Sequence, residues 1–159
     1  MQEKNPPSDV RQSLIKYAAN ILSRRPYFSS ALKKKMTDRA LHLGLADFDS
    51  EIEGIIKDLS NNGYLDDQYL SEAYVRKELH KGWGPRIINL KMRRLGIDQG
   101  LIISAINQEA GLQAQIEAIH HYSAKLKRYD QRVKINKFFQ RGFNGPAIFK
   151  AFDSAPPAD

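Results

Sequence analysis

The sequence predicts an all-α protein, and three observations lead to that prediction. Valine and threonine, which favour strands, are scarce, whereas leucine, isoleucine, alanine, lysine and glutamate are plentiful. No run of residues alternates apolar and polar side chains between turn signals, as a half-buried strand would. Signals that start and stop helices recur along the chain instead. Hydrophobic residues make up 42% of the 159 residues, which is enough to bury a core and argues against disorder.

Caps and breakers divide residues 9–62 into three predicted helices. The expected N-caps are Ser8 or Asp9, then Ser29 or Ser30, and then Ser50, which has capping-box spacing to Glu53. The first helix should end before Pro26, because proline disfavours helical backbone in the residue that precedes it. A glycine should end the second helix. The expected core residues are Leu14, Ile15, Ala18, Ile21, Leu22, Ala31, Leu32, Met36, Leu43, Ile52, Ile55, Ile56 and Leu59.

The middle of the chain repeats this order of helices. Asp66 is placed to cap a helix over residues 66–81, and Leu65 and Leu70 flank it with the spacing of a hydrophobic staple. A helix over 85–95 should follow, since proline is well suited to the first position of a helix. A third should cover 98–108, with Asp98 between Ile97 and Ile102 in the same staple spacing. The expected helix stops are Gly63, Gly82 and Gly96.

A third round of helices is expected over 112–128, 131–141 and 144–152. Placing Gly96 on Gly142 aligns Ile97 with Phe143, Ile102 with Ile148, Ile103 with Phe149, Ala105 with Ala151, Ile106 with Phe152, Arg86 with Arg132, and Lys91 with Lys137. A fixed period of 46 or 47 residues is typical of stacked helical units that cannot bury their apolar faces alone. We therefore predict three tandem three-helix repeats over 9–62, 63–110 and 111–153, in an extended array, with flexible ends at 1–8 and 154–159.

Charge and composition restrict the class of partner. The formal net charge is +7, which indicates a nucleic acid, an acidic protein surface or an anionic membrane as partner, or simply a basic, solvated surface. The absence of cysteine excludes disulfides and is compatible with a reducing compartment. No apolar run reaches the length of a membrane-spanning helix, and the N-terminus lacks the apolar segment of a signal peptide. We expect a soluble, cytoplasmic protein that does not enter membranes.

The basic helices around Trp83 are the best candidates for a binding surface. Lysine and arginine can hold phosphates without reading sequence, or pair with acidic groups on a protein. Trp83 could stack on a base or fill a partner's pocket, or it could hold its helix pair together. The cations should line one concave face. The candidate contact residues are Arg76, Lys77, Lys81, Trp83, Arg86, Lys91, Arg93, Arg94, Arg132, Lys134 and Lys137.

Catalytic and metal chemistry find no support in the sequence. Asp66 and Asp67 lie at a helix start, where capping explains them better than an acid–base or metal pair. The four histidines lack the spacing of a zinc site, and the glycines near Lys81 do not form a phosphate-binding loop. We expect no catalytic residue, no cofactor and no metal.

Several motifs at helix boundaries stand out together. They are Gly63-Tyr64-Leu65-Asp66-Asp67, Lys81-Gly82-Trp83-Gly84-Pro85-Arg86-Ile87, Leu95-Gly96-Ile97, Arg132-Val133-Lys134-Ile135, Phe138-Phe139 and Arg141-Gly142-Phe143. At this spacing they resemble the RecX family, whose members regulate bacterial recombination. The resemblance extends from about Ile15 to Phe152. The chain departs from the family pattern at Ala31, where an acidic residue is usual, and at Glu78, where arginine is frequent.

The resemblance implies a non-enzymatic regulator of the RecA recombinase, built from three repeats in a curved, elongated shape. Such proteins bind the RecA–ssDNA filament and inhibit its ATPase, strand-exchange and coprotease activities, which links them to DNA repair and the SOS response. The residues given above would then contact RecA or ssDNA, and a monomer is expected. Two alternatives stay open: a stand-alone helix–turn–helix module that binds ssDNA or dsDNA directly, and an interaction scaffold without a nucleic-acid role.

Overall fold

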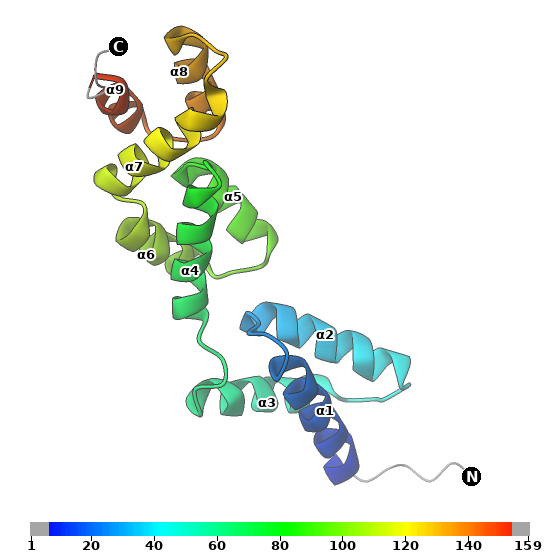
Figure 1. Cartoon of the computed structure of the whole chain (residues 1–159). Helices are drawn as coiled ribbons and strands as arrows, with labels where there is room; N and C mark the ends of the chain where they lie inside the picture. Colours follow the sequence, from blue (N-terminus) through cyan, green and yellow to red (C-terminus); the bar gives the residue numbers. More distant parts are fainter. Residues whose placement is uncertain (1–6, 154–159) are drawn as a thin grey trace. The chain divides into compact units, whose positions relative to one another are not determined.

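The structure, a computed structural model, describes residues 7–153, and in this range the chain is helical throughout with no strand (Figure 1). The all-α prediction is therefore confirmed. Of the expected flexible ends at 1–8 and 154–159, residues 1–6 and 154–159 lie outside the described residues, whereas residues 7 and 8 belong to α1. The helices are α1 (Pro7–Leu22), α2 (Ser29–His42), α3 (Asp49–Asn61), α4 (Asp67–His80), α5 (Pro85–Arg94), α6 (Gln99–Glu109), α7 (Leu112–Ser123), the 3₁₀ turn η1 (Ala124–Leu126), α8 (Gln131–Gln140) and α9 (Gly145–Asp153).

The chain forms two compact units, one that ends at Leu70 and one that begins at Ser71. The first unit contains α1, α2 and α3, and the second contains α5 to α9 and most of α4. The predicted third repeat and residues 71–110 of the predicted second repeat thus share one unit, whereas residues 63–70 belong to the first unit. The three-repeat arrangement and its curvature stay predictions.

The first unit is a bundle of three helices that all contact one another. Leu14 and Ala18 of α1 are four residues apart and fully buried, as a single apolar stripe requires. They pack with Leu32 and Met36 of α2 and with Ile52 of α3, none of which is exposed. An apolar groove of about 550 Å³ remains between α1 and α3. Burial of these side chains is the main stabilising term of the unit.

Two helices in this unit begin earlier than the serine caps predict. The N-cap of α2 is Phe28, and Asp67 accepts a hydrogen bond of 2.8 Å from the backbone N–H of Ser29. The N-cap of α3 is Phe48, so that Ser50 lies inside the helix rather than at its cap. Phe48 packs against the core, and this packing fixes the start of α3 although its side chain cannot accept a hydrogen bond. The expectation of serine caps at these two helices was wrong.

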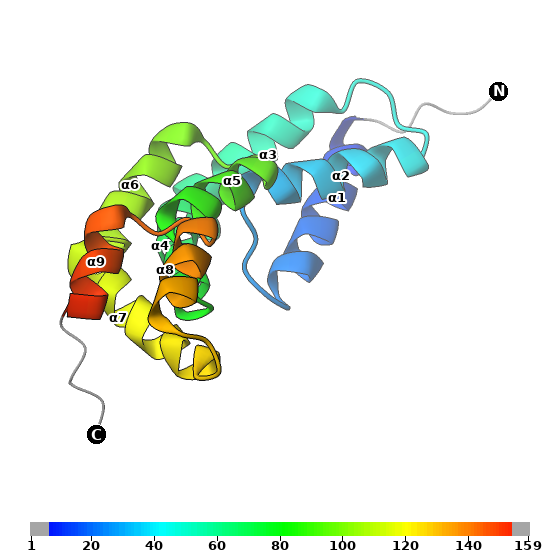
Figure 2. The same cartoon turned by 90° about the horizontal axis from the view of Figure 1, so that it is seen from above.

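In the second unit, α5 packs on α6, and α9 packs on both α7 and α8; Figure 2 shows α7, α8 and α9 gathered together. Its buried residues include those that the sequence alignment pairs: Ile97 and Phe143, Ile102 and Ile148, and Ala105 and Ala151. Ile103 and Phe149, also paired, are both about half exposed, at 50% and 54%. Equivalent positions in α6 and α9 therefore have equivalent burial.

Glycine ends α5 and α8 in the same way. Gly96 and Gly142 have φ of 73° and 85°, a left-handed conformation that side chains with a Cβ adopt only at a cost. The next residue then donates back into the helix, from Ile97 to Met92 at 3.3 Å and from Phe143 to Phe138 at 3.2 Å. These are Schellman motifs, and they place the start of the next helix.

The helix predicted over 112–128 is shorter than expected. Regular α-helix stops at Ser123, and a 3₁₀ turn continues to Leu126. Such a turn tightens the backbone, and it directs the chain back toward Asp130. There the Asp130 carboxylate accepts the backbone N–H of Val133 at 2.8 Å and caps α8. The chain reverses here because of this tight turn, and α7 cannot extend further.

Candidate functional site

The predicted binding region is centred on the turn between α4 and α5, and this turn docks on the turn between α8 and α9. The backbone N–H of Gly84 donates to the carbonyl of Arg141 at 2.8 Å, and that of Arg86 donates to Gly142 at 3.2 Å. A Cβ on Gly84 would overlap the backbone of Gly142 and Phe143. Gly84 is therefore required by the close approach of two backbones, which fixes α5 relative to α8.

Trp83 is held between two cations in this turn. The Nζ of Lys91 lies 4.2 Å from the centre of the indole ring, and the guanidinium of Arg141 lies 4.0 Å from it. Arg141 also lies 4.1 Å from the ring of Tyr122 and donates to the carbonyls of Gly82 and Lys81, at 2.5 and 2.9 Å. These are the contacts expected if Trp83 holds its helix pair together. Stacking of a base on Trp83 would have to displace them.

Two of the predicted cations share one buried carboxylate. Glu78, only 3% exposed, accepts hydrogen bonds from Lys81 at 2.7 Å and from Lys91 at 2.5 Å. Burial alone would raise the pKa of Glu78, but the hydrogen bonds and positive charges of both lysines outweigh it and hold the pKa below its ordinary value. Glu78 thus stays ionised, and it links α4 to α5.

The other predicted contact residues fall into two groups. Arg76 pairs with Glu109 at 2.6 Å, Arg86 donates to the carbonyl of Phe139 at 3.1 Å, and Lys137 lies 4.4 Å from the ring of Tyr129. Five further cations form no ion pair, side-chain hydrogen bond or ring contact within residues 7–153. They are Lys77, Arg93, Arg94, Arg132 and Lys134.

Carboxylates and histidines show structural contacts. Asp66 accepts the backbone N–H of Tyr69 at 2.9 Å at the start of α4, so both predicted capping aspartates accept bonds from helix N-termini. His80 and His121 stack with ring centroids 4.3 Å apart. Within residues 7–153, no group of three or more metal-ligating side chains comes together. Across the same residues, no helix is both long and apolar enough to span a bilayer.

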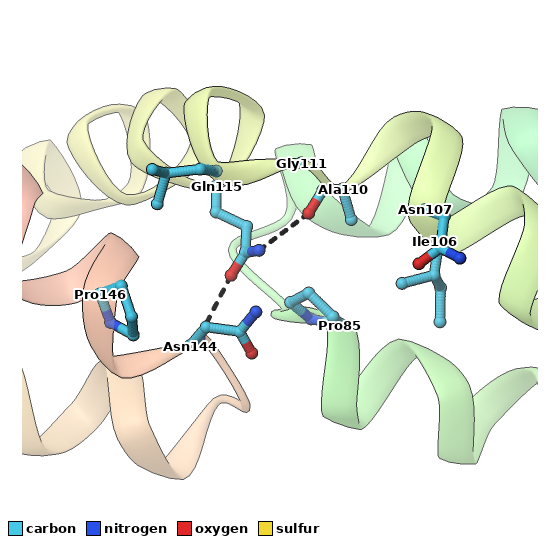
Figure 3. Close-up of a pocket in the computed structure, with 9 residues that line it drawn as sticks. Pro85, Ile106, Asn107, Ala110, Gly111, Gln115, Asn144 and Pro146 are labelled. Carbon is cyan, nitrogen blue, oxygen red and sulfur yellow. Dashed lines mark hydrogen bonds between the residues drawn. The ribbon is translucent and has the colours of Figure 1, made fainter.

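Sequence reasoning missed the residues that hold this region together. Gln115, 2% exposed, donates to the carbonyl of Ala110 at 2.8 Å and accepts the backbone N–H of Asn144 at 3.1 Å. Figure 3 shows it joining the α6–α7 turn to the start of α9 beside a pocket of about 250 Å³. Gln115 and Arg141 give no sequence signal, because their partners are backbone atoms far along the chain. Glu78 did give a sequence signal, because it stands where the RecX family pattern frequently has arginine.

Comparison with known proteins identifies relatives of the whole chain. No protein-family model matches it. A protein named Regulatory protein RecX from Legionella pneumophila (strain Corby) is 28% identical over 141 residues, covering 85% of this chain and 89% of the relative. One of the same name from Cronobacter sakazakii (strain ATCC BAA-894) is 26% identical over 167 residues, covering 96% and 100%. These relatives support the RecX family for this chain. The resemblance noted in the sequence motifs is thereby confirmed.

Solved RecX structures share the fold. The crystal structure of RecX from Lactobacillus salivarius superimposes with a TM-score of 0.73 at 21% identity and covers 92% of this chain and 96% of that one. A second crystal structure, of regulatory protein RecX, gives 0.71 at 21% identity and covers 92% and 73%. The helices of this chain therefore follow the fold of the solved RecX structures.

Proposed function

We propose that the chain is a non-enzymatic regulator that binds the RecA–ssDNA filament and inhibits its ATPase, strand-exchange and coprotease activities. The observation that carries this proposal is its similarity, over 85% of the chain, to a protein named Regulatory protein RecX. The motif resemblance links that family to RecA. In this proposal the protein acts in the cytoplasm as a monomer, and its three repeats form a curved array along the filament.

The charges of the second unit support an anionic partner. Arg93, Arg94, Arg132 and Lys134 lack acidic partners within residues 7–153, and Arg93, Arg94 and Arg132 are exposed. Attraction between these cations and phosphates or acidic side chains would raise the rate of association. Lys81 and Lys91 share the Glu78 carboxylate, and we assign them to structure rather than to partner contact.

The test is ATP hydrolysis by a matched RecA on ssDNA with increasing amounts of this protein. We expect hydrolysis to fall, and we expect the double variant Arg93→Glu/Arg94→Glu to require much more protein for the same inhibition. The control is Lys16→Glu/Lys57→Glu, which makes the same change in net charge at two exposed lysines of the first unit. Unchanged hydrolysis at molar excess of the unmodified protein would refute the proposal.

The alternative function, a stand-alone nucleic-acid binding module, predicts another pattern. It requires strong binding to dsDNA without RecA, and that binding should fall steeply with salt because phosphate contacts release counterions. If this is seen while RecA activity is unaffected, the alternative replaces the proposal. Binding to an acidic protein with no affinity for DNA would favour the scaffold interpretation instead.

A further inference from the structure

Two phenylalanine rings lie exposed side by side on neighbouring helices of the second unit. Phe139 of α8 is 39% exposed and Phe149 of α9 is 54% exposed. Their ring centroids are 5.9 Å apart with an angle of 65° between the ring planes. Gly145 lies against both rings, since a Cβ there would be 3.7 Å from Phe139 and 3.9 Å from Phe149. An exposed pair of large aromatic side chains with no polar atom is more than the scattered apolar surface of most proteins.

Positively charged side chains belong to the same helices as this aromatic pair or contact their backbone. The guanidinium of Arg86 hydrogen bonds to the Phe139 carbonyl at 3.1 Å, so it lies next to the base of that side chain. Arg132 precedes Phe139 by seven residues, which places both on one face of α8. Arg93 stands in the same relation to Arg86 on α5. The segment 131–153 contains five lysines and arginines and one acidic residue, Asp153.

We propose that Phe139 and Phe149 form a platform on which bases of single-stranded nucleic acid stack, while Arg86 and Arg132 hold the adjacent phosphates. Exposed aromatic rings beside a cationic surface suit this ligand, because every base has a flat π face and a phosphate on each side. An apolar protein side chain fits less well, since Asn136, one turn before Phe139 on α8, is exposed and polar.

A single strand is favoured over a duplex for a physical reason. The bases of a duplex are already stacked and paired, so a surface platform cannot reach their faces without separating the strands. This inference rests on the proposed function, because it names the groups that would touch the DNA strand. The sequence had indicated Trp83 as the residue on which a base could stack. We place base stacking on Phe139 and Phe149 instead, because the Trp83 ring is already in contact with Lys91 and Arg141.

The experiment measures binding of the full chain, without RecA, to two fluorescent oligonucleotides of equal length. One is oligothymidylate, and the other has the same phosphates but abasic sugars. We expect the unmodified protein to prefer oligothymidylate about five- to hundredfold, the range that stacking of one or more bases supports. Phe139→Leu/Phe149→Leu should lose this preference and keep the affinity for the abasic strand. Phe149→Trp should keep the preference.

Two further variants separate stacking from other effects. Ile103→Leu changes the equivalent exposed position of α6 and should leave the preference unchanged. Arg86→Gln/Arg132→Gln should weaken binding of both oligonucleotides and reduce its dependence on salt. Circular dichroism of the leucine variant before and after heating checks that it is folded. The leucine variant retains apolar surface, so that loss of its preference reports stacking.

Either of two results would overturn the platform: no preference for oligothymidylate in the unmodified protein, or a preference that survives in the leucine variant. If the preference is absent while RecA hydrolysis is still inhibited, only this inference fails and the proposed function stands. If the preference is present but RecA is unaffected, the proposed function fails and the platform stands. Loss of RecA inhibition in the leucine variant without any base preference would identify the pair as a protein contact and also overturn the platform.

Discussion

Replacing Gly84 with alanine is the most direct test of how the second unit is held together. Gly84 has φ −85° and ψ 169°, which any residue can adopt, so backbone strain plays no part. The obstacle is the overlap of the new Cβ with the backbone of Gly142 and Phe143. The two turns would have to separate, and the hydrogen bonds from Gly84 to Arg141 and from Arg86 to Gly142 would lengthen.

The cost of this change can be built from two terms. Loss of two backbone hydrogen bonds costs about 0.5–1.5 kcal/mol each, and overpacking adds about 1–3 kcal/mol. We therefore expect the free energy of unfolding to fall by about 2–6 kcal/mol. Gly111→Ala is the matched control, because Gly111 is also an N-cap, with φ −60° and ψ 171°, and a Cβ there would meet nothing within 4 Å. The control should change stability by about 1 kcal/mol or less.

Urea unfolding of both variants, followed by circular dichroism and by tryptophan fluorescence, measures the difference. The chain has one tryptophan, and it lies in the docked turn, so its emission reports on that turn alone. If the turns separate, Trp83 should become more exposed and its emission should shift to longer wavelength. Equal stability of the two variants, with unchanged emission, would show that the turns do not contact each other as described.

Three further predictions concern burial and charge. Ile102→Ala should lower the free energy of unfolding by about 2–5 kcal/mol, because the Ile102 side chain is fully buried. Ile103→Ala, at a half-exposed site, should lower it by about 1 kcal/mol or less. Chemical denaturation of both variants measures the difference. Lys91→Met should cost about 2 kcal/mol, since it leaves the Glu78 carboxylate with Lys81 alone, and an equally stable variant would contradict the pairing. Because the folded-state pKa of Glu78 is lowered, its stabilising contribution is complete above its unfolded pKa and lost as the pH falls through the folded pKa. Urea unfolding at a series of pH values measures the stability difference between the unmodified protein and Glu78→Gln, and this difference should become smaller as the pH falls. A difference that does not change with pH would contradict the lowered pKa of Glu78.

Much of the fold could be predicted because its signals are local. Asp66 and Asp98 were expected to cap helices and do, through hydrogen bonds to backbone N–H groups within three residues. Gly96 and Gly142 were expected to end helices, and both have positive φ. Phe48 and Phe28 were not expected as caps, since Phe48 packs against the core at the start of α3, and the start of α2 takes its side-chain hydrogen bond from Asp67, far along the chain. A pattern of polar caps cannot reveal a start that depends on distant core contacts.

The candidate site was less predictable because it depends on contacts between distant residues. The sequence indicated that cations gather around Trp83, and Lys91 and Arg141 do lie at its ring. It did not indicate which cations are neutralised, since that depends on whether α4 brings Glu78 within reach of α5. Nor could it show that Phe139 and Phe149 are exposed together, because apolar residues in amphipathic helices are ordinarily assigned to the core.

Glu78 influences where positive charge is available on the second unit of this chain. A carboxylate buried between Lys81 and Lys91 pairs with both lysines and cancels one of their two positive charges. A cation at position 78, which the family resemblance makes frequent, would instead repel both lysines and need a counter-charge of its own. Arg93 and Arg132, which form no ion pair within residues 7–153, thereby become the main candidates for partner contact. Charge reversal at Lys91 would place a second carboxylate beside Glu78, so a loss of binding in that variant could not be separated from a loss of stability. Arg93 is exposed, and charge reversal there reports binding alone.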